Sequence, residues 1–381
     1  MDQRVEFAMK ALRTDNFRAL CQEYGISAKT GYKWQKRFLQ HGASGMAERS
    51  RRPWRSSGQL GEDVICEMIR FKQAHRHWGP RKIRALYLRQ YGTAPSESSF
   101  KRILERAGLT QPRRRQRSDQ AGRLWSGKRA ERPNEVWTVD FKGWWYDPEG
   151  HRCEPLTVRD EHSRYVLELR RMANGRSEGV RACFEELFER HGLPGAIRSD
   201  NGGPFAANSL LGLSRLSAWW VALGIDLERG RPAHPQDNGA HERMHRDIRV
   251  ELQPHTTDQA ALDLWRQEFN YERPHEALGM KCPGEIYQKS QRAYSGTPED
   301  VEYVGMAHRK VASHGKIKWQ NSVIFISTSL AGWSVGLKPL GCGRLETWFG
   351  RLLLGWIDPV TASFQSAEDR RLEAGNQSTN V

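Results

Sequence analysis

Apolar residues recur at helical spacing from Asp15 to about residue 42, and turn and cap residues interrupt them. The stretch that starts at Asp15 reads DNFRALCQEYGISAKTGYKWQKRFLQHG. It predicts a helix that turns Phe17, Leu20 and Cys21 inward, and then a second helix. Gly25 suits the tight left-handed turn between them, and Ser27 can cap the second helix. This pattern is typical of a helix-turn-helix.

The second helix of such a unit is the one that enters the major groove of DNA. Its polar and basic positions predict DNA contacts at Thr30, Lys33, Lys36 and Arg37. Three more helical stretches are expected near 60–74, 80–90 and 96–107, and they allow a second helix-turn-helix. We therefore expect one all-α domain over 1–55 and another over 56–112.

The pattern changes at residue 134, where apolar and polar residues begin to alternate. The stretch EVWTVDFKGWWY predicts a half-buried strand. Further strands are expected over 153–158, 165–169 and 196–198, with 225–228 as a possible fifth. Helices are expected from Ser177 to Gly192, over 213–224, and from near Gly239 towards Leu252. The alternation of elements predicts a mixed α/β domain over 134–290.

The last part of the chain has short segments rich in Val, Ile, Trp and Gly, such as KIKWQNSVIFIS (316–327). Short strands with glycine turns predict a small β-barrel over 299–364. Residues 365–381 are polar and are expected to form a disordered tail.

Charge is distributed unevenly along the chain, which has a net charge of +15. Residues 1–133 contain 30 Lys and Arg against 12 Asp and Glu, whereas 134–381 contain 30 against 33. The basic N-terminal third therefore favours a polyanion such as DNA as its partner. Within it, residues 113–133 lack hydrophobic periodicity and predict a linker whose Arg113, Arg114 and Arg115 contact phosphates.

Targeting signals and metal-binding cysteine pairs are not evident. No long apolar run predicts a membrane helix, the first residues do not resemble a signal peptide, and the six cysteines are scattered without a C-x-x-C pair. We expect a cytoplasmic protein without a membrane partner.

Three acids fall at positions that suggest shared chemistry. Asp140 lies on the first expected strand, Asp200 follows the strand at 196–198, and Glu242 lies on a later helix. If the two strands share a sheet, the three carboxylates can converge and repel one another unless a cation neutralises them. Oxygen ligands favour Mg²⁺ or Mn²⁺, and two ions about 4 Å apart would support attack at phosphorus.

These motifs in order resemble a known family. WTVDFKGWW (137–145), SDNGGPF (199–205) and HPQDNGAHERMHRD (234–247) look like the core of DDE transposases related to retroviral integrases, above all bacterial insertion-sequence transposases. DEHSRYVL (160–167) and NYERPHEALGMKCPGEIY (270–287) extend the match. The resemblance implies a ribonuclease-H-like fold with Asp140, Asp200 and Glu242 as catalytic metal ligands.

The same resemblance implies the partners and the reaction. The partners would be the double-stranded terminal inverted repeats and target DNA, bound by at least a dimer. The reaction would be Mg²⁺-dependent strand cleavage and strand transfer. Basic residues after the glutamate, here Arg246 and Arg249, would approach the DNA backbone.

The chain departs from the family pattern in the spacing between its second and third acids. It also contains two further acids near the third, so the third catalytic acid must be chosen among them. Forty-one residues separate Asp200 from Glu242, more than in many integrase-like enzymes, and LLGLSRLSAWW (210–220) has the character of an insertion. Asp237 and Asp247 lie near Glu242. Asp237 suits a turn, and Asp247 should point elsewhere on the helix.

Three alternatives remain open from the sequence. HERMH (241–245) is a literal H-E-x-x-H, the spacing of a zinc protease. A metal-dependent nuclease of the same fold would cut DNA without transferring it. A DNA-binding repressor derived from a transposase would bind without cutting.

Overall fold

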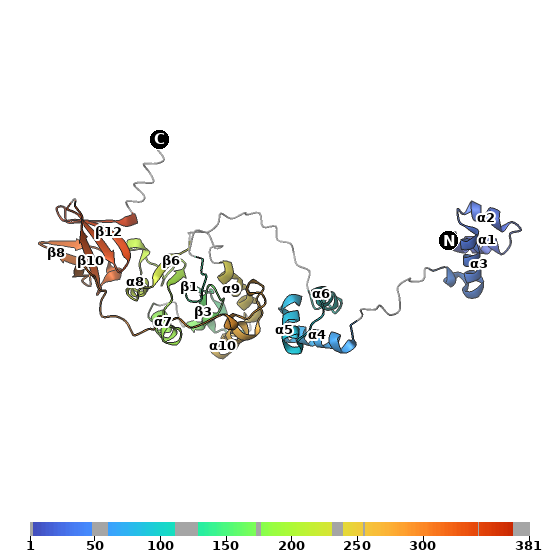
Figure 1. The fold of residues 1–381 in the computed structure, drawn as a ribbon, viewed down its shortest axis with the longest axis horizontal. Helices are drawn as coiled ribbons and strands as arrows, with labels where there is room; N and C mark the ends of the chain where they lie inside the picture. Colours follow the sequence, from blue (N-terminus) through green and yellow to red (C-terminus); the bar gives the residue numbers. More distant parts are fainter. Residues whose placement is uncertain are drawn as a thin grey trace, which may run out of the picture. The chain divides into compact units, whose positions relative to one another are not determined.

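The computed structural model describes residues 3–47, 60–110, 129–172, 177–230, 239–253, 256–341 and 343–368. The chain divides into two compact units, residues 1–64 and 65–381, and each is described by itself (Figure 1). In these described ranges, no helix combines the length and the apolar character needed to cross a bilayer.

The first unit contains a three-helix domain. Its helices are α1 (Gln3–Ala11), α2 (Phe17–Glu23) and α3 (Ala28–His41), followed by the short 3-10 helix η1 (Gly42–Met46). Gly25 has φ +63° in the turn, and the Ser27 hydroxyl accepts a hydrogen bond from the Thr30 amide, as the sequence predicted. The helix α1 was not expected, although Phe7 is part of the domain core.

A glycine sets the distance between the two helices of the helix-turn-helix. A Cβ on Gly31 would lie 2.6 Å from Cys21 Sγ, closer than two such atoms can approach. Glycine at this position therefore lets α3 pack directly on α2.

The next helices follow the expected boundaries closely. They are α4 (Glu62–Ala74), which crosses the boundary between the units, α5 (Pro80–Tyr91) and α6 (Glu97–Arg106). Ser96 caps α6 by accepting a hydrogen bond from the Ser99 amide, and Phe100 and Leu104 are fully buried. The expectation of an N-terminal all-helical region is confirmed.

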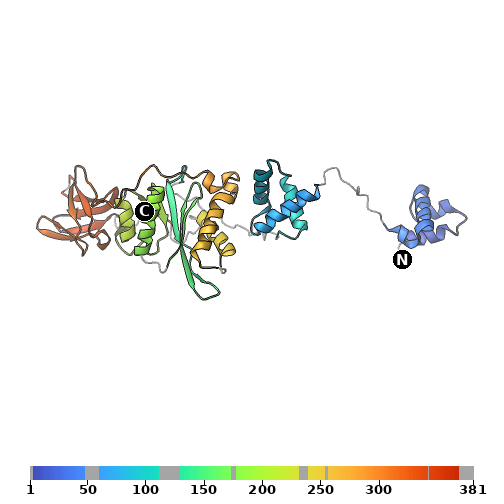
Figure 2. The same ribbon diagram turned by 90° about the horizontal axis from the view of Figure 1, so that it is seen from below.

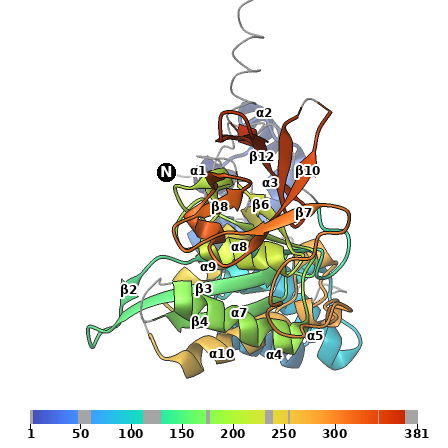
Figure 3. The same ribbon diagram turned by 90° about the vertical axis from the view of Figure 1, so that its left-hand side faces the viewer.

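The central domain is built on a mixed sheet. Its elements are β1 (Val136–Phe141), β2 (Trp145–Tyr146), β3 (Arg152–Asp160), β4 (Val166–Met172), α7 (Ser177–His191), β5 (Ala196–Ser199), η2 (Leu210–Gly212), α8 (Arg215–Ala222), β6 (Asp226–Arg229), α9 (Gly239–Glu251), α10 (Gln259–Gln267), the π-helical turn η4 (Glu268–Glu272), η5 (Glu276–Leu278) and η6 (Pro283–Glu285). The long strands β3 and β4 run antiparallel side by side (Figure 3). β1 joins β3 antiparallel and β5 parallel, and β6 extends the parallel side.

Helices cover both faces of this sheet, which Figure 2 shows nearly edge-on. Trp137 and Val139 of β1 pack against α7 and α8 in one apolar cluster. Residues of α9 and α10, among them Met244 and Trp265, form a second cluster on the opposite face. The expectation of a half-buried first strand is therefore wrong: Thr138, at a polar position, is 0% exposed because α9 covers it.

The Asp160–Ser163 segment, one of the motifs behind the resemblance, has a structural role in the turn between β3 and β4. Asp160 Oδ2 accepts hydrogen bonds from the amide and the hydroxyl of Ser163 at 2.8 and 2.6 Å. Its other oxygen accepts from the Asn134 amide at 2.7 Å. The buried carboxylate therefore closes the hairpin and ties it to the start of β1.

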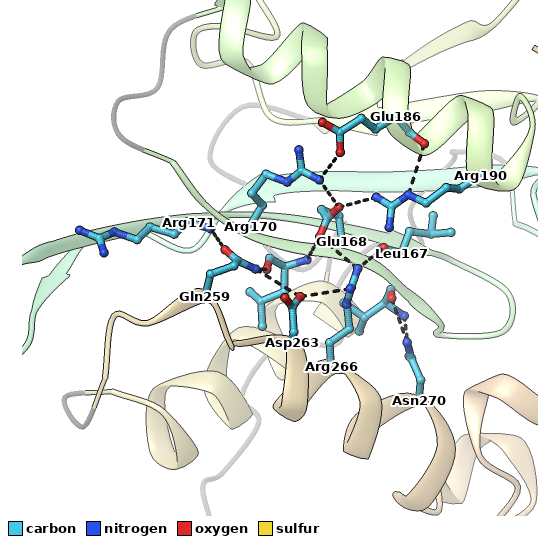
Figure 4. A network of polar contacts seen from close by, with 12 residues as sticks. Leu167, Glu168, Arg170, Arg171, Glu186, Arg190, Gln259, Asp263, Arg266 and Asn270 are labelled. Carbon is cyan, nitrogen blue, oxygen red and sulfur yellow. Dashed lines mark hydrogen bonds and ion pairs between the residues drawn. The ribbon is translucent and has the colours of Figure 1, made fainter. Parts of the chain in front are cut away.

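A buried glutamate connects three elements of the domain (Figure 4). Glu168 of β4 has a side chain that is 3% exposed, and it accepts hydrogen bonds from three arginines. They are Arg170 of β4 at 3.0 Å, Arg190 of α7 at 2.7 Å and Arg266 of α10 at 3.0 Å. Since α7 and α10 lie on opposite faces of the sheet, this network joins both helical layers through one carboxylate.

The C-terminal domain contains antiparallel strands. They are β7 (Ala307–Lys310), β8 (Lys316–Trp319), β9 (Ser322–Phe325), β10 (Ser334–Pro339), β11 (Leu345–Phe349), β12 (Leu352–Asp358) and β13 (Ser363–Ser366), with the 3-10 turn η7 (Thr328–Leu330). The described strands pair as an open five-stranded path from β13 to β7 and a separate β8–β9 hairpin. The antiparallel sheet is as expected, but its strand pairing does not close the barrel that the sequence suggested.

The stretch at 210–220, which the sequence analysis interpreted as an insertion, packs against this C-terminal sheet. Leu213 and Ala218 belong to the apolar cluster that also contains Val335 and Leu337 of β10. The Ser329 hydroxyl donates to the Leu213 carbonyl at 2.6 Å. These residues therefore form a platform on which the C-terminal domain packs.

Candidate active site

The register of two parallel strands places Asp140 and Asp200 next to each other. β1 pairs with β5 so that Val136 lies opposite Ala196 and Thr138 lies opposite Arg198. Two residues further along each chain are Asp140 and Asp200. Because parallel strands keep this offset, both carboxylates come to the same end of adjacent strands.

The loop that follows β5 leaves room for the Asp200 carboxylate. A Cβ on Gly202 would lie 2.9 Å from Asp200 Oδ2, so a larger residue there would press on the carboxylate. Arg229 of β6 holds the rest of the loop by donating to the carbonyls of Phe205 and Gly212 at 3.3 and 3.1 Å. Its positive charge also acts on Asp200.

The third acid lies in the first turn of α9. Glu242 is exposed there, next to the buried His241. Asp247, the other acid on this helix, is paired with Arg273 at 2.8 Å. Arg273 also pairs with Glu251, so it fixes the second half of α9 against the segment after α10. The segment NYERP of the resemblance motif thus positions the helix that carries Glu242.

Electrostatics links the three acids. The pKa of Asp140 is raised to about 7, first by burial and then by the negative charges of Asp200 and, more weakly, Glu242. Lys142 opposes this shift weakly. The charges of Asp200, at the end of β5, and of Glu242, on α9, therefore both oppose the ionisation of Asp140 on β1. A divalent cation held at Asp140 would offset that cost.

This raised pKa predicts how the metal-free protein responds to pH. The folded chain keeps a proton on Asp140 up to about pH 7, whereas an unfolded chain releases it near pH 4. The folded state binds more protons between these values, so this group lowers the free energy of unfolding as pH rises from about 4 to about 7. In EDTA, Asp140→Asn should gain about 1–3 kcal/mol of stability over wild type between pH 5 and pH 8.

The measurement is denaturant unfolding of both proteins at the two pH values. The exposed Asp226, replaced by asparagine, serves as the matched control and should track wild type. Mg²⁺ should narrow the gap between wild type and Asp140→Asn at pH 8, because it stabilises only the ionised site. A gap of equal size at pH 5 and pH 8 without metal would contradict the assignment.

Basic side chains border the carboxylates. Burial and the neighbouring Arg249 lower the pKa of Lys142, and Asp140 acts in the opposite direction. Arg246 and Arg249 are both exposed on α9. Sequence reasoning missed Lys142, although a residue two places after Asp140 on an extended chain points to the same side.

The proposed DNA-contacting residues of α3 differ in their surroundings. Lys33 and Lys36 are exposed, and Lys29, which the sequence analysis did not select, is exposed on the same face. Thr30 is half-buried, and its hydroxyl lies 3.0 Å from the Ser27 hydroxyl, so it contributes to the helix cap. Arg37 is half-buried, and Arg113, Arg114 and Arg115 lie outside the described residues.

Two histidines of α9 lie beside the acids. His241 is fully buried, and burial lowers its pKa well below the usual value. Burial, with Lys142 and Arg159 nearby, lowers the pKa of His245 to about 3. His245 Nδ1 lies 3.8 Å from Asp140 Oδ2. The H-E-x-x-H spacing does bring two imidazoles to one helix face, but both Nε2 atoms approach the hydroxyl of Thr157.

The chain matches several family models. Residues 3–53 match a helix-turn-helix domain and residues 30–104 a homeodomain-like domain. Residues 130–235 and 223–283 match two models of the integrase core domain. The chain thus carries an integrase core with helix-turn-helix domains on its N-terminal side.

The chain is also similar to proteins of bacterial insertion elements and to retroviral polyproteins. An insertion element IS407 protein of 31.7 kDa from Burkholderia multivorans is 29% identical over 255 residues, which cover 62% of this chain and 84% of the relative. An insertion element IS476 protein of 39.2 kDa from Xanthomonas euvesicatoria is 26% identical over 62% of this chain and 68% of its own length. The Gag-Pol polyprotein of baboon endogenous virus is 29% identical over 57% of this chain, but the match spans only 12% of the polyprotein.

Among solved structures, the catalytic core domain of BIV integrase is 26% identical and covers 40% of this chain and 93% of its own, with a TM-score of 0.32. The HTLV-2 integrase core domain, solved in complex with magnesium, is 16% identical and covers 42% of this chain and all of its own, also with a TM-score of 0.32.

Proposed function

We propose that this protein is a transposase that binds the ends of a mobile DNA element and joins them to target DNA. The single observation that carries the proposal is that the negative charges of Asp200 and Glu242, which come from two other elements, both raise the pKa of Asp140 on β1. The integrase core and the similarity to insertion-element proteins support it. The mixed sheet also supports a ribonuclease-H-like fold over 134–290.

The donor set suits hard divalent cations. Asp140, Asp200 and Glu242 would hold Mg²⁺ or Mn²⁺, as one ion or a pair, through carboxylate oxygens. Bound there, the cation supplies activation of the attacking oxygen and stabilisation of the leaving oxygen. The protein's own contribution is to fix the carboxylates through the β1–β5 register and to keep Asp140 half-buried.

The chemistry is two displacements at phosphorus. In cleavage, a water oxygen bonds to the phosphorus at the element end while the bond to the 3′-oxygen breaks, and that oxygen takes up a proton. In transfer, the freed 3′-hydroxyl loses its proton and its oxygen bonds to a target phosphorus. The bond from that phosphorus to the target's own 3′-oxygen breaks, and the departing oxygen takes up a proton. Neither step needs a covalent bond between protein and DNA.

DNA binding is distributed over several parts of the chain. The exposed lysines of α3 would place that helix in the major groove of the inverted repeat. Arg246, Arg249 and the basic residues at 113–115 would contact phosphates, which position DNA without reading its sequence. Because two ends must be brought to one target, the working form would be a dimer or larger.

Strand transfer with oligonucleotides that carry the element ends tests the proposal. Wild type with Mg²⁺ should release a 3′-end and yield a joined product with target DNA, and EDTA should stop both. Asp200→Asn should remove both products. Joining by Asp200→Asn at the wild-type rate would refute the assignment, and cleavage by wild type without any joined product would identify a nuclease.

A further inference from the structure

The two histidines of the H-E-x-x-H sequence have different hydrogen-bonding surroundings. His241 Nδ1 lies 2.8 Å from Thr138 Oγ1, and its Nε2 lies 2.6 Å from Thr157 Oγ1. Both of its nitrogens are thus engaged, and its side chain is 0% exposed. His245 uses only Nε2, which lies 2.8 Å from the same Thr157 oxygen. His245 Nδ1 faces Asp140.

A count of protons at Thr157 indicates the tautomer of His245. The hydroxyl has one proton to donate, and three acceptors lie within reach: the two Nε2 atoms and, at 2.8 Å, the Asp140 carbonyl oxygen. If the proton goes to Asp140 or to His241, then His245 must donate from Nε2, and its Nδ1 carries a lone pair. If the proton goes to His245, the resulting Nδ1–H points at Asp140 Oδ2 from 3.8 Å, too far for a hydrogen bond.

The distance between Nδ1 and Oδ2 suits a shared ion. Two ligand atoms about 2.1–2.2 Å from one metal, at angles near 90–110°, lie roughly 3.0–3.6 Å apart. The observed 3.8 Å needs a shift of only a few tenths of an ångström. An imidazole whose other nitrogen is held by a hydrogen bond is the usual arrangement of a metal-ligating histidine.

We propose that His245 supplies a nitrogen ligand to the cation held by Asp140, with Thr157 and His241 orienting its ring, so that the site prefers Mn²⁺ to Mg²⁺. The inference rests on the proposed function in that the same carboxylate holds the cation. The preference follows because imidazole suits transition metals, whereas Mg²⁺ favours oxygen ligands and keeps its waters. His241 is a positioning residue here, since each of its two nitrogens is engaged by a threonine hydroxyl.

Pulsed electron paramagnetic resonance of the full-length chain loaded with Mn²⁺ tests this proposal directly. Wild type should show nuclear coupling from a directly bound imidazole nitrogen, which shifts as expected when the histidines are labelled with ¹⁵N. His245→Ala and His245→Asn should both lose that coupling and weaken Mn²⁺ binding at least about tenfold, with a smaller effect on Mg²⁺. Thr157→Val should keep the coupling or weaken it, with Mn²⁺ affinity lowered about 10–100-fold.

The matched control is His151→Ala. Two groups of potential ligands occur in the described part of the chain: Asp140 with His241 and His245, and, at an exposed turn, His151 with Asp147 and Glu149. The nitrogen coupling must persist in this variant, since its loss would place the ion at that turn and overturn the proposal. Two variants at His245, each checked by circular dichroism, separate loss of a ligand from loss of folding.

Other outcomes are equally decisive. Nitrogen coupling that survives in both folded His245 variants would overturn the proposal, as would Mn²⁺ binding to wild type without any nitrogen coupling, or no Mn²⁺ binding at all. Strand transfer is scored separately on the same samples. If the nitrogen coupling depends on His245 but the protein never joins DNA, His245 is a metal ligand and the proposed transposase function is wrong. If the protein joins DNA but the coupling does not depend on His245, the function stands and His245 is not a ligand.

Discussion

Glu242→Gln is expected to lower the rates of strand cleavage and strand transfer by at least about 10³-fold, while DNA binding stays close to wild type. Glutamine keeps the size of the side chain but removes the charge that a cation would neutralise. The helix-turn-helix domains and the basic residues of α9 are unchanged, so affinity for the element ends should persist. Single-turnover assays with end-bearing oligonucleotides measure the rates, and gel-shift titration measures the affinity.

Asp247→Asn is the matched control on the same helix. Asp247 is paired with Arg273 and lies five residues after Glu242, so it should lose some stability and keep catalysis within roughly tenfold of wild type. A result in which Asp247→Asn is as inactive as Glu242→Gln, while both remain folded, would mean that the wrong acid of α9 has been assigned. The comparison therefore tests whether Glu242, and not Asp247, is the catalytic acid of α9.

Local signals in the sequence were enough to place most elements. Ser27 and Ser96 begin helices where they were expected to, and Gly192, with φ +76°, ends α7. Helix caps and C-terminal glycines act through a few neighbouring residues, so a short stretch of sequence contains every residue that takes part in the cap. The helix α1 was missed because it is only nine residues long and lies before the helix-turn-helix pattern that starts at Asp15.

The sequence pattern of a strand could not show which distant segment covers each of its faces. The alternation in β1 identified which residues share a face but not what lies on that face. Thr138 and Thr157 look like solvent-facing positions, yet both are 0% exposed because the histidines of α9 cover them. A strand between two helical layers therefore has the same alternation as a strand at the surface whenever the covering helix contributes polar side chains.

The same limit applies to the candidate site. The three acids were selected from local motifs, and the β1–β5 register explains why two of them lie side by side. His245 was assigned to a rival protease motif, and Lys142 was not selected, because their relevance depends on which atoms α9 and β1 bring together. The pairing of Asp147 or Asp247 with distant partners was equally invisible, since Thr257 and Arg273 lie far away in the sequence.

Glu168→Ala is expected to destabilise the central domain by about 3–5 kcal/mol. Its carboxylate is 3% exposed and accepts hydrogen bonds from Arg170, Arg190 and Arg266. Removing it leaves three guanidinium groups close together without their common anion. Their mutual repulsion and the loss of the connection between α7 and α10 both favour unfolding. Urea unfolding, followed by the fluorescence of the buried tryptophans of this domain, measures the change.

Glu186→Ala provides the control, because Glu186 also pairs with Arg170 but is 54% exposed. Water already screens that pair, so its removal should cost no more than about 1 kcal/mol. If the two variants lose similar stability, the arginines around Glu168 must find other partners or water when it is absent. In that case the two helical layers are held by their apolar contacts with the sheet, and the charged network contributes to orientation rather than to stability.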